Sequence, residues 1–255
     1  MNLKGKTILI TGGASGIGLE AVKQFLAIGA EVIITGRNQA KLDAAKKTYP
    51  AITAIKSDAG NEGDAKDLFN KVKELGGIDI LYNNAAVLVP PSNLGMANTK
   101  HMEGAAYEME VNYLGVIRLN NLFMDMLKSG GEAAIINTTS ILSQAPSLIE
   151  ATYSSSKTAL AFYTISLREH LKIIGSKLKI FELIPPLVAT EMTAERNDKK
   201  ISTQEMVKGL INGLSKNHYT IRVGDAKIFS LINRLFPGTA FNIINPKKNH
   251  QLLQN

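Results

Sequence analysis

Tyr153 and Lys157 lie four residues apart, in a segment that an apolar pattern continues as a helix to about Ile174. Residues i and i+4 of a helix share one face, so the phenol and the ammonium are predicted to be neighbours. A free tyrosine titrates near pH ~10, and both a nearby cation and the first turn of a helix favour its phenolate. The pair could therefore form a proton donor with a lowered pKa. The same spacing also fits an ordinary surface tyrosine beside a lysine.

The composition is that of a globular protein. The chain has 255 residues, of which 45% are hydrophobic and 20% charged, enough for one α/β domain. It has no cysteine, which excludes disulfides, thiolate zinc sites and cysteine nucleophiles. We expect no metal site, because the four histidines lack metal-ligand spacing. They are His101, His170, His218 and His250.

The net charge of +7 could favour a nucleic acid, a membrane surface or an anionic small molecule. The lysines are spread along the chain, and no basic run alternates with aromatic residues, so no motif supports nucleic-acid binding. A solvated basic surface is the favoured interpretation, and a phosphate-bearing ligand is the second. No apolar run approaches the ~18 residues of a membrane span, and the amino-terminal stretch lacks signal-peptide features. We expect a cytoplasmic protein with no membrane or nucleic-acid partner.

Short apolar runs alternate with longer segments of helical periodicity. Strands are predicted at 7–10, 32–35, 52–55, 78–82, 133–137, 178–184 and, at an edge, 219–223. Helices are predicted at 17–26, 41–47, 61–75, 100–127, 153–174, 203–214 and 225–235. The alternation predicts a Rossmann-type, doubly wound α/β fold with about seven parallel strands and helices on both faces. No linker is visible, so residues 1–255 are expected to form a single domain that ends in a tail, 236–255.

A glycine-rich run, 11–18, lies between the first predicted strand and the first predicted helix. Glycines permit a tight turn and close approach to a pyrophosphate, and the helix N-terminus adds free N–H groups and a positive dipole. A plain strand-to-helix turn is the alternative, but this context is the one that nucleotide binding requires. The predicted contacts are Gly12, Ser15, Gly16, Ile17 and Gly18.

The end of the second predicted strand indicates which dinucleotide binds. A carboxylate there would accept a hydrogen bond from a ribose 2′-OH, whereas an arginine accommodates a 2′-phosphate. The chain has Arg37 at this place, 19 residues beyond Gly18, and no acidic residue between Arg37 and Asp43. A surface arginine is the alternative, but the missing acid favours NADP(H), with Asn38 assisting.

The motifs of this chain, taken in their order along the sequence, resemble those of the short-chain dehydrogenase/reductase family. The resemblance runs from residue 3 to about residue 225 and rests on the glycine run, segment 83–85, Ser140 and the Tyr153–Lys157 pair. It implies that Tyr153 protonates a carbonyl oxygen in reduction and deprotonates the alcohol in reverse. Lys157 would tune Tyr153 and bind the nicotinamide ribose. Ser140 would hydrogen-bond the substrate oxygen, and Asn112 would hold a water that links Lys157 to solvent.

The resemblance also implies further cofactor contacts: Asp58 at the adenine, Asn84 and Ala85 at its ribose, and Pro185, Val188 and Thr190 at the nicotinamide. Segment 83–85 as a whole resembles the turn that lines this ribose. Ala86 and Pro186 depart from the family, which usually has glycine at both places. The stretch 184–192 and the C-terminus look like a branch labelled DltE-like oxidoreductases.

The substrate side is predicted from the same resemblance. A mobile lid is expected at 187–202, which follows the nicotinamide segment and lacks periodicity. The residues expected to line the pocket are Leu142, Glu150, Leu187 and Met192. They are mostly apolar, although plain core packing is an alternative for each of them.

The resulting hypothesis is an NADP(H)-dependent carbonyl reductase acting on a neutral, fairly apolar ketone or aldehyde. A non-catalytic NADP(H)-binding regulator on the same fold is the alternative, because a fold does not fix a function. The resemblance further implies a homodimer or homotetramer. The segment 100–127 and the Tyr153 helix are the candidate interfaces.

Overall fold

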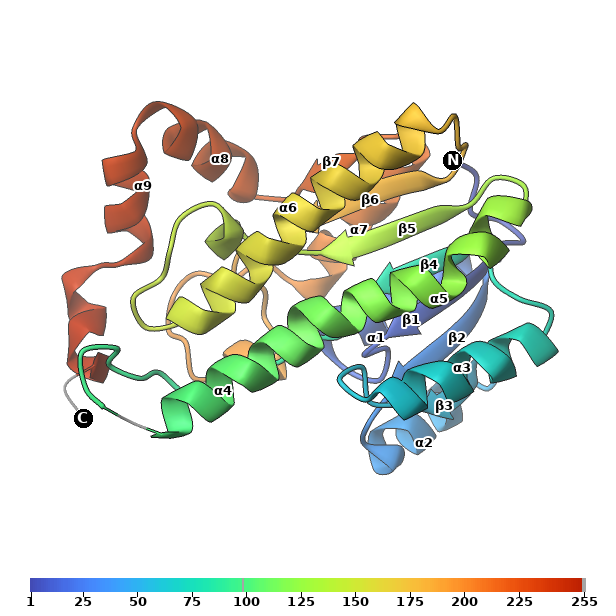
Figure 1. Cartoon of the computed structure of the whole chain (residues 1–255), viewed down its shortest axis with the longest axis horizontal. Helices are drawn as coiled ribbons and strands as arrows, with labels where there is room; N and C mark the ends of the chain where they lie inside the picture. The colour runs from blue at the N-terminus through green and yellow to red at the C-terminus, as the bar shows by residue number, and fades with distance from the viewer. Residues whose placement is uncertain (98, 254–255) are drawn as a thin grey trace.

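Seven parallel strands form one sheet in the order β3-β2-β1-β4-β5-β6-β7 (Figure 1). The computed structural model describes residues 1–97 and 99–253. Its strands are β1 (Thr7–Thr11), β2 (Glu31–Gly36), β3 (Thr53–Lys56), β4 (Ile80–Asn83), β5 (Ala134–Thr138), β6 (Lys179–Ile184) and β7 (Thr220–Arg222). The predicted doubly wound parallel sheet is confirmed, and its last strand lies at an edge as expected.

Helices cover both faces of the sheet (Figure 1). They are α1 (Gly16–Ala27), α2 (Gln39–Thr48), α3 (Glu62–Glu74), α4 (Thr99–Met109), α5 (Gly115–Ser129), α6 (Ala151–Ile173), α7 (Thr203–Ser215), α8 (Ala226–Leu235) and α9 (Pro237–Ile244). Buried side chains of α1, α2 and α7 share one hydrophobic cluster with the sheet. Those of α3, α5 and α6 share a second cluster. The sheet therefore has one helical layer on each face.

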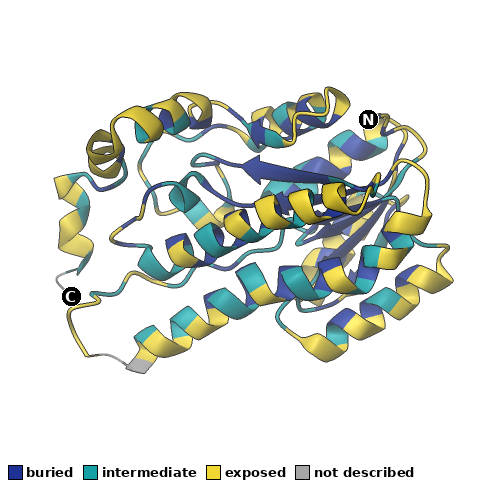
Figure 2. Cartoon of the chain, turned by 45° about the horizontal axis from the view of Figure 1, so that its top comes forward, coloured by how far each residue is buried: buried dark blue, intermediate teal, exposed yellow. Residues whose placement is uncertain are grey.

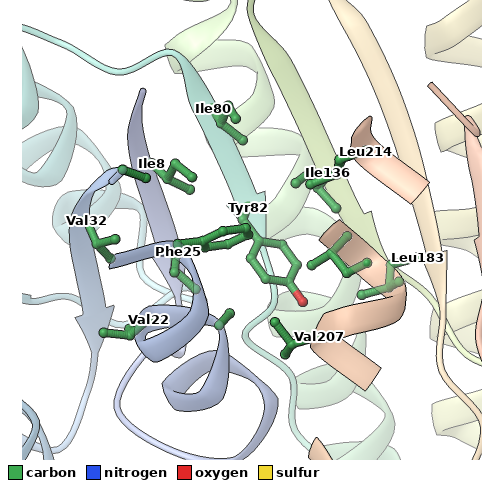
Figure 3. Close-up of a cluster of buried hydrophobic side chains, with 14 of the residues drawn as sticks. Ile8, Val22, Phe25, Val32, Ile80, Tyr82, Ile136, Leu183, Val207 and Leu214 are labelled. Atoms are coloured by element: carbon green, nitrogen blue, oxygen red, sulfur yellow. The ribbon is translucent and has the colours of Figure 1, made fainter. Parts of the chain in front are cut away.

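Strand β1 shows how the sheet separates these two layers. Ile8 and Ile10 belong to the first cluster and Leu9 to the second, since successive strand side chains point to opposite faces. In the first cluster, the rings of Phe25 and Tyr82 meet edge to face with centroids 6.5 Å apart (Figure 3). Figure 2 shows buried strands beneath helices whose outer faces are exposed. Strands covered on both faces account for the continuous apolar runs of the sequence.

Side-chain caps fix where several helices begin. The Asn38 side chain accepts a hydrogen bond from the Lys41 amide at 3.0 Å and caps α2, as its residue type favours. Asn61 caps α3 in the same way. Ser202 likewise caps α7, so segment 187–202 ends at a capped helix.

The helix predicted at 100–127 contains an irregularity. Between α4 and α5 the chain forms a π-helical turn, η1 (Glu110–Leu114). The two helices nevertheless continue each other as one long rod across the molecule (Figure 1). Such a turn carries an extra residue in the helical ladder and is found frequently at functional sites.

The C-terminal segment folds back toward segment 187–202. After α9, a 3₁₀ segment, η4 (Lys247–Leu253), ends beside the loop that follows β4, where the Asn93 side chain donates to the Leu253 carbonyl at 2.9 Å. Lys248 pairs with Asp198 at 2.8 Å. The stretch 187–202 contains only the short 3₁₀ helix η3 (Glu191–Thr193) and the Val188–Ile201 bridge. Within 1–97 and 99–253, no helix combines the length and apolarity needed to cross a bilayer.

Candidate active site

A cavity of about 470 Å³ opens at the carboxyl ends of the strands. It lies where the strand order reverses, between β1 and β4, which is the usual ligand position in an open α/β sheet. Its lining comes from the glycine loop, the ends of β2 and β3, the turn after β4, α6 and the segment after β6. All the predicted cofactor contacts except Gly18 line it.

The glycine loop has the conformation and the close contacts that favour glycine. Gly12 has a φ of +65°, and a Cβ there would lie 3.0 Å from the Ala85 Cα. Gly18 packs directly against the backbone of the loop. A Cβ at this position would lie only 2.2 Å from the Gly12 carbonyl oxygen. Ser15 begins α1 in an extended conformation with no hydrogen bond from its side chain. The first turn of α1 therefore offers its free N–H groups to the cavity.

Three residues around the start of α2, two of them basic, line one end of the cavity. Arg37, Asn38 and Lys41 all line it. The Arg37 guanidinium donates to the Tyr107 hydroxyl and lies 5.8 Å from the centre of that ring. Lys41 pairs with Glu191 of segment 187–202. The sequence analysis did not predict Lys41 or Tyr107 at this end of the cavity. Lys41 could have been predicted, because it lies one helical turn beyond Arg37.

The turn after β4 is tied to the end of β1. The Thr11 hydroxyl oxygen accepts from the amides of Asn84 and Ala85, each at 3.0 Å. The Asn84 side chain donates to the Thr11 carbonyl at 3.0 Å, so Asn84 and Ala85 lie in the cavity wall. Asn83 was expected in the same wall, and this expectation is wrong. Its buried side chain points toward α5 and β5 and donates to Asn120 and Asn137 at 2.8 and 2.9 Å.

The third and sixth strands bring the remaining predicted contacts into the wall. Asp58 lines the cavity, and its carboxylate accepts from the Gly60 amide at 2.9 Å, which orients it. Pro185, Val188 and Thr190 line the opposite side. Thr190 lies so near the glycine loop that a Cβ on Gly16 would come within 3.2 Å of it.

The Tyr153–Lys157 pair forms as the spacing predicts. Both residues lie near the start of α6 and line the cavity. The Lys157 ammonium lies 5.7 Å from the centre of the Tyr153 ring. It also donates to the Thr138 carbonyl, at the end of β5, at 2.9 Å. The lysine is thereby held between its tyrosine and the sheet.

The electrostatics of this pair differ from the expectation. Burial raises the pKa of Tyr153, and the carboxylates of Glu150 and Glu108 raise it further, while a hydrogen bond with Ser140 lowers it. The protein alone therefore shifts the Tyr153 pKa in the direction opposite to the prediction, because desolvation of the phenolate and the two carboxylates outweigh the hydrogen bond with Ser140. Burial also lowers the pKa of Lys157 to about 8. Tyr153 thus keeps its proton at neutral pH.

Ser140 and Asn112 lie beside this pair without lining the cavity. Ser140 follows β5, and its hydroxyl oxygen accepts from the Leu142 amide at 3.1 Å. Asn112 lies in the π-helical turn η1 and is fully buried. Its amide group donates to the Val87 carbonyl at 2.9 Å and to the Ser156 hydroxyl at 3.1 Å. The structure thus gathers all four predicted catalytic residues around the start of α6.

The predicted substrate residues are only partly brought together. Met192 lines the cavity, whereas Leu142, Glu150 and Leu187 lie outside its lining. The Glu150 carboxylate is instead paired with Arg196 of segment 187–202 at 2.8 Å. Sequence reasoning missed Arg196 because the pair joins segments 46 residues apart. No group of three or more His, Asp or Glu side chains in the described part of the chain is arranged to hold a metal ion.

The cavity fits a dinucleotide on the observations of this structure. Its glycine cradle would be filled by any Cβ at Gly12, its basic end suits phosphate, and its far end carries the tyrosine and lysine. This combination of sheet, glycine turn and Tyr153–Lys157 pair defines the class. The chain belongs to the short chain dehydrogenase family, whose model matches residues 6–201.

Individual relatives agree with this membership. The chain is 32% identical to the uncharacterized oxidoreductase DltE of Bacillus subtilis (strain 168), over 87% of this chain and 89% of DltE. It is 31% identical to the 3-beta-hydroxysteroid dehydrogenase of Comamonas testosteroni, over 80% of this chain and 79% of that protein. A short chain dehydrogenase from Burkholderia cenocepacia J2315, solved in complex with NADP, covers the whole of both chains with a TM-score of 0.83 and 25% identity. The resemblance to the family and to its DltE-like members is confirmed.

Proposed function

We propose that this protein is an NADP(H)-dependent oxidoreductase that interconverts a neutral, fairly apolar ketone or aldehyde and its alcohol. The observation that carries the proposal is the placement of Tyr153 and Lys157 at one end of a cavity whose other end is basic. The glycine loop lies between these ends. One elongated ligand could therefore place a phosphate near Arg37 and a reactive ring near Tyr153.

The preference for NADP(H) rests on the basic end. Arg37 and Lys41 line the cavity there, and no acidic residue lies between Glu31 and Asp43 in the chain to accept from a ribose 2′-OH. An arginine at this position accommodates a 2′-phosphate. The NADP complex of the Burkholderia protein supports the same choice.

The residues around Tyr153 would manage the proton while the bound cofactor supplies or accepts hydride. Tyr153 keeps its proton at neutral pH, so it would donate that proton to the oxygen of a carbonyl being reduced. Ser140 would hydrogen-bond the same oxygen, and two hydroxyl donors would stabilise its developing charge. Lys157 would bind the ribose of the nicotinamide half, and Asn112 would hold a water on the path from Lys157 to solvent.

The proposed substrate is neutral because the one acidic residue predicted for its pocket is already paired. The Glu150 carboxylate is bonded to Arg196, and the groups in the cavity wall beside Tyr153 include Val188 and Met192. An apolar alcohol or ketone would bury its surface against such side chains. Leu142 and Leu187 are proposed to join this pocket with Met192. The steroid dehydrogenase activity named for the Comamonas relative is of the same chemical type.

The proposal is tested by NADPH oxidation over a panel of ketones and aldehydes, with Tyr153→Phe as the matched variant. We expect turnover that falls by about 10²–10⁴-fold in Tyr153→Phe, as removal of a general acid predicts. NADPH binding, followed by fluorescence, should change less than about twofold, since the ring is kept. Binding without turnover on any substrate would instead favour a non-catalytic NADP(H)-binding regulator.

We also propose that the protein forms a homodimer or homotetramer through α6 and the α4–α5 rod. Phe162 and Ile165 are exposed on α6, and Leu114 is exposed on the rod. Large apolar side chains grouped on an open face mark a contact surface. Light scattering should show a dimer or tetramer that Phe162→Glu dissociates, and a monomeric wild-type protein would contradict this assignment.

A further inference from the structure

A buried carboxylate that the mechanism above does not use lies next to the catalytic pair. Glu108 on α4 has no exposed surface, although glutamate is rarely buried without a partner. None of the ion pairs formed by the described residues includes it. Burying a carboxylate in this way costs free energy, so its place calls for a physical reason.

One of its oxygens fixes the loop that follows β4. Glu108 Oε1 accepts from the Val89 amide at 2.9 Å. One turn further along the rod, Asn112 accepts from the Val87 amide and donates to the Val87 carbonyl, both at 2.9 Å. Two side chains four residues apart thus hold both ends of segment 87–89. This segment leads away from the cavity wall, which contains Val87.

The other oxygen faces the catalytic helix. Glu108 Oε2 is buried and has no partner in good hydrogen-bond geometry among the described residues, although the Thr152 side chain of α6 interacts with the carboxyl. α4 packs along α6. The groups of α6 and its N-cap that interact with the Glu108 carboxyl are Glu150, Thr152, Tyr153 and Lys157. On α4 itself, His101 also interacts with this carboxyl. Burial raises the pKa of Glu108, and Thr152, the Val89 amide, His101 and Lys157 lower it, in that order.

We infer that Glu108 is a positioning residue that provides a buried negative charge for the Lys157 ammonium and holds segment 87–89 against the site. The inference rests on the proposed function for its catalytic consequence. Lys157 donates to a neutral carbonyl, that of Thr138, and forms none of the ion pairs found among the described residues. Burial lowers the pKa of Lys157, and the charge of Glu108 is the cause that opposes this lowering. Without Glu108, Lys157 would lose its proton nearer to neutral pH.

Glu108→Gln separates the two roles. The glutamine oxygen can still accept from the Val89 amide, but the negative charge is gone. Glu103→Gln is the matched control, because Glu103 is an exposed glutamate on the same helix. Glu108→Leu removes both the charge and the acceptor. Any loss of activity in Glu108→Leu beyond that in Glu108→Gln would measure the contribution of the hydrogen bond that positions segment 87–89.

The direct readout is the titration of Lys157, followed by NMR of a protein with ¹³C-labelled lysine and assigned with Lys157→Met. We expect a midpoint near pH 8 in the wild type and about one pH unit lower in Glu108→Gln, while Glu103→Gln matches the wild type. This measurement needs no turnover, so it stands even if the proposed reaction fails. An unchanged midpoint in Glu108→Gln overturns the inference.

The kinetic readout is the pH profile of kcat from about pH 6 to about pH 10 with an active substrate. We expect the alkaline limb of Glu108→Gln to move down by about one unit, so that lowering the pH restores its activity. A uniform loss at every pH would show a purely structural role and overturn the inference. If Glu108→Gln does not fold, Lys157→Met tests the same coupling in reverse. The titration of Glu108 must then move to higher pH, and no movement overturns the inference.

Discussion

Replacing Gly18 with alanine should push α1 away from the glycine loop. A Cβ at position 18 would lie 2.2 Å from the Gly12 carbonyl oxygen and 2.8 Å from the Asn84 side-chain nitrogen. Ordinary C···O contacts are about 3.3 Å, so the backbone must separate by roughly 1 Å. The Gly12 carbonyl accepts from the Asn84 side chain at 3.3 Å, so rotating it aside would break this bond. Overpacking of this kind costs about 1–3 kcal/mol.

The same displacement should weaken cofactor binding, because it moves the N–H groups of the first turn of α1. If the whole strain must be overcome for binding, NADPH affinity falls between about fivefold and about a hundredfold. The melting temperature should fall by about 2–4 °C for each kcal/mol. Fluorescence titration with NADPH and thermal unfolding measure the two effects.

Gly131→Ala is the control for this substitution. A Cβ at Gly131 would have no neighbouring heavy atom within 4 Å, and its φ is not left-handed, so alanine fits there. This variant should bind NADPH as the wild type does. The reasoning is refuted if Gly18→Ala retains both its affinity and its melting temperature. If Gly18→Ala lowers the melting temperature but leaves the NADPH affinity unchanged, the close contact at position 18 does not control the loop that binds the cofactor.

Three further outcomes follow from the site. Arg37→Ala should weaken NADPH binding by at least about tenfold and leave NADH binding unchanged, and equal losses for both cofactors would contradict the assignment of the 2′-phosphate. Lys157→Met should lower both kcat and NADPH affinity, whereas Tyr153→Phe should lower mainly kcat; a loss of kcat alone in Lys157→Met would deny its contact with the cofactor. Burial lowers the pKa of Lys157 from 10.5 to about 8. Between these two pH values Lys157 is protonated in the unfolded chain but mostly deprotonated in the folded protein. The contribution of Lys157 to the free energy of unfolding therefore rises with pH in this range. Urea denaturation at about pH 7 and about pH 9.5 should therefore show the stability of Lys157→Met, relative to the wild type, falling by about 2 kcal/mol as the pH rises.

The strands and the glycine turn were predictable because local sequence determines them. Strands covered on both faces need continuous apolar runs, and a backbone that turns against the Ala85 Cα needs glycine at position 12. The Tyr153–Lys157 contact was predictable for the same reason, since it lies within one helix. The lining position of Arg37 follows from its place at the end of a strand.

The features that were missed depend on contacts between distant segments. The side chain of Asn83 could face the cavity or the sheet, and its choice is decided by Asn120 and Asn137, which only the fold brings near. Glu150 is likewise paired across 46 positions of sequence with Arg196. The sign of the Tyr153 pKa shift depends on burial, which spacing within a helix does not reveal.

The π-helical turn at Glu110–Leu114 also controls the phase of the rod that contains it. One extra residue in a helix rotates everything before it by about 100° relative to everything after it. Deleting a single residue here would leave α5 packed on the sheet while swinging Tyr107 and Glu108 round to another side. The one inserted residue thus sets the rotation of α4 about its axis relative to α5, so that α4 turns Tyr107 and Glu108 toward the active site while α5 stays packed in the core.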